Sequence, residues 1–128
     1  MEGPEGQDRL KEQVVAALRS SGASFALVFG STARGTSGPG SDLDVGAFWR
    51  DEPPQPWDVE LPEGVDLVVL DRAPLELAGT IALEGQVLFE DDPNERVRWV
   101  AQYRRIWLDE RPRFLQAHRE FLEAVRGR

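Results

Sequence analysis

Two aspartates one residue apart interrupt an apolar segment, and they constrain the fold of this chain more than any other feature. In "SDLDVGAFW", Asp42 and Asp44 fall within a stretch that otherwise has the composition of a buried strand. Aspartate is depleted in strands, so its presence needs a physical reason. Because side chains two apart share a face of a strand, we expect both carboxylates on one face, with Leu43 and Val45 on the other. The pattern predicts a strand that presents two carboxylates to one side of a sheet.

The segment before these aspartates has the composition of a turn that holds an anion. The apolar run "SFALVFG" predicts a strand ending at Phe29, and "GSTARGTSGPG" follows it. Gly30 at the strand end lets the backbone approach a ligand closely, and the Ser31 hydroxyl can donate to a phosphate oxygen. The Gly-Lys-Ser/Thr ending of a Walker loop is absent. Arg34 and Ser41 are further candidates for nucleotide contacts, although a solvent-facing arginine and a turn serine fit these positions as well.

A third acid stands inside the next apolar segment. "VDLVVLD" predicts a strand in which Asp66, Val68 and Leu70 share a face. Magnesium takes oxygen ligands, and a pair of divalent cations can clamp a phosphoryl group during in-line displacement. Asp42, Asp44 and Asp66 are therefore candidate catalytic residues and ligands for two Mg²⁺ ions, with Mn²⁺ as an alternative. Taken singly, each acid also fits a turn, a cap or a solvent-facing position; their occurrence together favours the metal site.

The remaining segments predict helices around a short sheet, in one domain of the α+β class over residues 1–128. A helix is expected over about 8–21, the sheet over about 24–90, and a helical segment over about 93–126 that Pro112 breaks or restarts. Within the sheet region, "APLELAGTIALEG" has the periodicity of a helix, and "QVLFED" predicts the fourth strand.

Composition limits the compartment and the partners. The chain has no cysteine, no signal-peptide core and no run of 18 apolar residues, so we expect a cytoplasmic protein without a membrane segment. The net charge of −8 argues against an extended nucleic-acid surface. It fits carboxylates that hold cations, and an acidic surface that serves solubility gives the same charge.

Two patterns in the C-terminal segment have both a structural and a functional interpretation. His118 falls on an apolar helical stripe, which favours a packed side chain over a catalytic one. Trp99, Tyr103 and Trp107 recur at helical spacing, together with Ile106. Core packing is the default for such a stripe, and an interface with a partner is the alternative.

The stretch from Gly30 to Asp44 resembles the signature of the DNA-polymerase-β-like nucleotidyltransferase superfamily. Over about residues 10–125 the chain is similar to minimal nucleotidyltransferases (MNT), the antitoxins of MNT–HEPN toxin–antitoxin pairs. The resemblance implies a polymerase-β palm-like fold, a short mixed β-sheet flanked by helices with further helices at the C-terminus. It also implies that Asp42 and Asp44 bind metal, that Asp66 is the third acid, and that Gly30 and Ser31 contact the nucleotide phosphates.

The same resemblance implies the reaction. A metal-dependent nucleotidyltransferase of this kind moves AMP from ATP to a hydroxyl and releases pyrophosphate, and in MNT–HEPN pairs the acceptor is a tyrosine of the HEPN toxin. Two alternatives stay open: an antitoxin that acts by binding alone, and a small-molecule (antibiotic) nucleotidyltransferase, which generally carries a further domain for its acceptor. A homo-oligomer is also left open.

Overall fold

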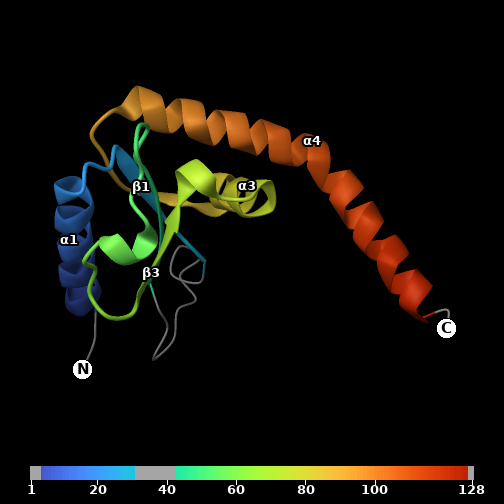
Figure 1. Ribbon diagram of the computed structural model, residues 1–128, viewed down its shortest axis with the longest axis horizontal. Coiled ribbons are helices and arrows are strands. Elements are labelled where there is room, and N and C mark those ends of the chain that lie inside the picture. The colour runs from blue at the N-terminus through green and yellow to red at the C-terminus, as the bar shows by residue number, and fades with distance from the viewer. Residues whose placement is uncertain (1–3, 31–42, 127–128) are drawn as a thin grey trace.

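The computed structural model describes residues 4–30 and 43–126, in which helices cover both faces of a four-stranded sheet (Figure 1). In chain order the elements are α1 Pro4–Ser20, β1 Phe25–Phe29, β2 Leu43–Phe48, the 3₁₀ turn η1 Pro56–Asp58, β3 Val65–Val69, the 3₁₀ turn η2 Leu70–Arg72, α3 Leu75–Glu84, β4 Gln86–Glu90 and α4 Pro93–Arg126.

The sheet is mixed, with strand order β3-β2-β1-β4. β1 runs antiparallel to both β2 and β4, whereas β2 and β3 are parallel. The register between β1 and β4 shifts between Ala26 and Leu27, which opposes Ala26 to Phe89 and Leu27 to Val87. The α+β class and the short mixed sheet expected from the sequence are confirmed.

Each face of the sheet has its own core because side chains alternate along the strands. On the α1 face, Ala26 and Val28 of β1 pack with Val14 and Leu18 of α1. On the other face, the neighbouring β1 residues Phe25 and Leu27 pack with residues of α3 and α4, among them Ile81 and Trp99. Fully burying one such side chain contributes about 1.5–3 kcal/mol, so the two cores hold both helical layers to the sheet.

The aromatic stripe of α4 packs in the second core. Trp99 lies 6.0 Å from the ring of Phe25 and 4.9 Å from that of Tyr103, measured between centroids. Trp107 packs against Gly79 of α3 so closely that a Cβ atom on Gly79 would lie 2.3 Å from Trp107 Cγ. The default interpretation of this stripe as core is confirmed, and Gly79 is the residue that permits the close approach.

Two expectations for the C-terminal segment are wrong. Pro112 neither ends nor restarts the helix, because α4 continues through it to Arg126. The proline ring removes one backbone hydrogen bond and displaces the preceding turn, which kinks a helix without having to stop it. Figure 1 shows α4 bending where its colour passes from orange to red. His118 lies beyond the bend and is exposed, since no other described element reaches this part of α4.

Within residues 4–30 and 43–126, none of the helices is both long enough and apolar enough to cross a membrane.

Candidate active site

The parallel pairing of β2 and β3 brings two of the three candidate acids side by side. Asp44 is the register partner of Asp66, and the next pair on the same face is Gly46 with Val68. Val68 packs on the core beneath α3 and α4, and a Cβ atom on Gly46 would lie 2.8 Å from Leu70 in that core. By alternation both carboxylates project from this same face, where adjacent strands are about 4.8 Å apart.

The two carboxylates differ in exposure. Asp44 is half-buried at the start of β2, whereas Asp66 is exposed at the start of β3. A half-buried acid and an exposed one at the same sheet end form a site that is open to solvent on one side. We refer to Asp44, Asp66 and the adjoining Gly30 as the carboxylate site.

Gly30 joins the carboxylate site from β1, the strand on the other side of β2 from β3. It follows β1 directly, and the last residue of β1, Phe29, is the register partner of Asp44. Gly30 has a φ of 74°, and a Cβ atom there would lie 2.5 Å from Asp44 Oδ2. Only glycine tolerates both the backbone conformation and this contact, so the residue type holds the Asp44 carboxylate against the backbone at the end of β1.

The other candidates, Ser31, Arg34, Ser41 and Asp42, lie outside the described residues. Among the residues that are described, no group of three or more histidine, aspartate or glutamate side chains is placed to hold a metal ion. The two acids that are brought together are nevertheless suitable donors for magnesium, which usually takes one or two protein carboxylates and completes its shell with water and substrate phosphates. The donor set therefore fits the expected cation, and the missing side chain at Gly30 leaves room for the Asp44 carboxylate.

A polar cluster at the opposite end of β2 was not predicted from the sequence. The Asp71 carboxylate accepts hydrogen bonds from the backbone N–H groups of Trp49 at 3.1 Å and Arg50 at 3.0 Å. The Arg50 side chain, from a backbone with φ of 76°, pairs with Glu95 of α4. Burial acts to raise the pKa of Glu95, but the hydrogen bond and charge of Arg50 and the nearby Ser24 hydroxyl together outweigh it, and the pKa is lowered. The cluster fixes the end of β2 to η2 and α4.

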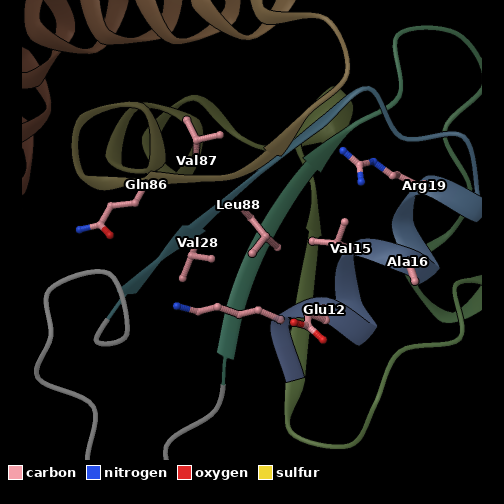
Figure 2. Close-up of a pocket in the computed structure, with 9 residues that line it drawn as sticks. Glu12, Val15, Ala16, Arg19, Val28, Gln86, Val87 and Leu88 are labelled. Atoms are coloured by element: carbon pink, nitrogen blue, oxygen red, sulfur yellow. The ribbon is translucent and has the colours of Figure 1, made fainter. Parts of the chain in front are cut away.

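A cleft of about 500 Å³ lies between α1 and β4, away from the carboxylate site (Figure 2). Val28 and Leu88 of the sheet face Val15 and Glu12 of α1 across it. Gly30, Asp44 and Asp66 do not line this cleft. Arg19, on its rim, is already engaged by Asp91 at 3.1 Å and by the ring of Phe89. This cleft is thus separate from the residues expected to carry the chemistry.

Residues 12–94, more than half of the chain, match the family model of polymerase beta nucleotidyltransferases. The chain belongs to this nucleotidyltransferase family. The match confirms the superfamily resemblance carried by the Gly-Ser and Asp-x-Asp residues, and it includes Gly30, Asp44 and Asp66. Comparison with curated proteins gives no match.

Solved structures with the same fold come from toxin–antitoxin complexes. A crystal structure of a toxin–antitoxin with AMP-PNP matches with a TM-score of 0.65 at 20% identity, over 84% of this chain and 98% of that one. A tri-AMPylated Shewanella oneidensis HEPN toxin in complex with its MNT antitoxin matches with a TM-score of 0.61 at 18% identity, over 88% and 98%. The MntA–HepT toxin–antitoxin gives 0.57 at 19% identity, over 88% and 99%. At these identities the similarity establishes the fold.

Proposed function

We propose that this nucleotidyltransferase is the antitoxin of a toxin–antitoxin pair and transfers AMP from ATP to a tyrosine hydroxyl of a HEPN toxin. The observation that carries the proposal is the pairing of Asp44 with Asp66 against Gly30, in a chain of this family. Two similar structures support the substrate and the partner, since one holds AMP-PNP and the other a tri-AMPylated HEPN toxin with an MNT antitoxin.

In the proposed reaction, Asp42, Asp44 and Asp66 would hold Mg²⁺, which neutralises charge on the triphosphate when bound. The backbone at Gly30 and the Ser31 hydroxyl contact phosphate oxygens. Asp66, the exposed acid, accepts the hydrogen bond of the acceptor hydroxyl and orients its oxygen toward the α-phosphorus. A bond forms between these two atoms, the bond from the α-phosphorus to the bridging oxygen breaks, pyrophosphate leaves, and the hydroxyl proton passes to solvent.

The exposure of Asp66 favours a protein acceptor over a small molecule. Small ligands are usually enclosed in a pocket that removes most of their surface from water. In the described part of the chain, the cleft of about 500 Å³ is formed by α1, β1 and β4 and does not include Asp66. An acceptor side chain carried by a partner protein needs no such enclosure, because the partner's own surface positions it.

Asp66→Asn tests the proposal because it keeps the size of the side chain and removes its charge. The variant should bind the toxin as wild type does but fail to adenylylate it, with transfer reduced by orders of magnitude, and cells expressing the toxin should not be rescued. Asp8→Asn on α1, an exposed acid on the far side of the sheet, is the matched control and should rescue fully. Full rescue by Asp66→Asn with intact association would instead show an antitoxin that acts by binding alone.

A further inference from the structure

The second half of α4, residues 108–125, extends away from the body of the molecule beyond α3, and we call it the arm (Figure 1). Among the residues of α4 whose side chains are described, Trp107, 7% exposed, is the last buried one. From residue 111 to 125, every residue whose side chain is described is exposed, apart from the half-buried Leu122. Among the side chains of α4 that are described, the buried ones thus end where the arm begins.

The arm carries an apolar stripe without any described element to cover it. Leu108, Leu115 and Leu122 repeat every seven residues, and Val125 continues their face. Leu115 is 54% exposed, and Phe121 beside the stripe is 63% exposed. A helix gains most of its stability from packing its apolar face, and an isolated helix of this length is marginal in water. The stripe therefore indicates a surface that a partner covers.

The position of the arm favours the acceptor protein as that partner. α4 lies on the same face of the sheet as Asp44 and Asp66, because both carboxylates share the face that α3 and α4 cover. Figure 1 shows the arm bending to the side of the molecule on which β1 ends and β2 begins, while its tip points away from the body. A protein held by the arm would thus lie on the side of the molecule from which the carboxylate site is reached.

Charge argues against two other occupants of the stripe, a second copy of this chain and an anionic membrane surface. The arm has four acidic residues and three arginines, whereas the whole chain has a net charge of −8, so most of the acidic excess lies in the body. Pairing two arms would bring two acidic bodies together, which self-repulsion opposes. An anionic membrane surface attracts basic amphipathic helices, and the arm has no lysine and no excess of arginine.

We propose that the apolar stripe of the arm is the docking surface for the protein acceptor. The acceptor presents an apolar face to the stripe, and the residues around that face are neutral or basic. This inference rests on the proposed function, since the acceptor is the proposed toxin. It adds that binding energy comes from the stripe and that the chemistry takes place at a separate site on the same face. Docking and transfer should therefore be separable by mutation.

The test uses the full chain and the HEPN toxin proposed as its acceptor, purified separately and titrated against each other by calorimetry. Leu115→Glu and Phe121→Glu should each raise the dissociation constant at least about 30-fold, because a charge placed in the centre of an apolar interface removes its principal contacts. Gln116→Glu adds the same charge on the polar face, where Gln116 bonds to Glu120, and should change the constant less than about 2-fold. Melting temperatures should not change for any of the three, since all the sites are exposed.

Wild-type affinity in both stripe variants would overturn the proposal, as would failure of the wild-type chain to bind the HEPN toxin. So would light scattering that shows the free chain as a dimer which Leu115→Glu converts to monomers, because a second copy would then cover the stripe. The outcomes also separate the two proposals. Stripe variants that lose binding while the wild-type chain binds but transfers no AMP would uphold the arm and refute the proposed reaction.

Discussion

Gly30→Ala is expected to disable the carboxylate site by a mechanism that can be separated from loss of stability. At φ of 74°, an alanine at this position adopts a left-handed conformation that costs about 1–2 kcal/mol. For a domain of this size, that cost lowers the melting temperature by roughly 3–5 °C per kcal/mol. The added Cβ would also lie 2.5 Å from Asp44 Oδ2, so the carboxylate must move away.

The displacement of Asp44 should have the larger functional effect. Shifting a catalytic group by about 1 Å can reduce a rate about 100-fold, and the contact of 2.5 Å demands a shift approaching that size. Gly22→Ala supplies the control, because Gly22 has a φ of 92° and its Cβ would have Trp49 Cδ1 at 4.0 Å as its nearest neighbour. The two variants share the backbone penalty, and only Gly30→Ala disturbs the site.

The assay is kcat/KM for adenylyl transfer to the toxin, measured well below the melting temperatures of both variants. Gly22→Ala should retain the wild-type value within a few-fold, and Gly30→Ala should lose about 100-fold. Equal values for the two variants, after equal losses of stability, would refute the assignment of Asp44 to the reaction.

Three further predictions concern stability and ligand binding. Gly79→Ala should lower the free energy of unfolding by about 1–3 kcal/mol in urea titrations, because the contact with Trp107 outweighs the gain in helix propensity; a more stable variant would contradict the packing described. The lowered pKa of Glu95 means that its stabilising effect is complete above its ordinary value of 4.5 and is lost as the pH falls through the folded value. The difference in unfolding free energy between wild type and Glu95→Gln should therefore be largest near neutral pH and shrink in acid, and a pH-independent difference would count against the Arg50 pair. Finally, ATP and Mg²⁺ together should raise the melting temperature by more than the sum of the shifts that each causes alone, since triphosphate oxygens complete the metal shell. A shift with ATP alone that equals the shift with both would argue against a metal at this site.

Local sequence patterns predicted the strands of the carboxylate site but not their arrangement. Period-2 alternation placed Asp44 and Asp66 inside strands and indicated which neighbours share their faces. It does not reveal that the two strands are adjacent and parallel, or that Asp44 and Asp66 are register partners. Register depends on long-range pairing, which becomes visible only in the folded sheet.

The errors in α4 have a related cause. The apolar stripe around His118 indicated an amphipathic helix, and periodicity shows which face is apolar without showing what covers it. Pro112 removes a single hydrogen bond from a helix of 34 residues, so the turns on either side are enough to keep the helix continuous. The pair of Arg50 with Glu95 joins residues 45 positions apart, a contact that no local pattern predicts.

The most direct test of the proposed reaction follows the phosphate that is transferred. The purified toxin is incubated with the wild-type chain, Mg²⁺ and ATP labelled at either the α- or the γ-phosphate, and protein-bound label is measured beside released pyrophosphate. The α-label should enter the toxin, the γ-label should leave as pyrophosphate, and Asp44→Asn should abolish both. Incorporation of the γ-label, or undiminished incorporation of the α-label by Asp44→Asn, would contradict the proposed reaction.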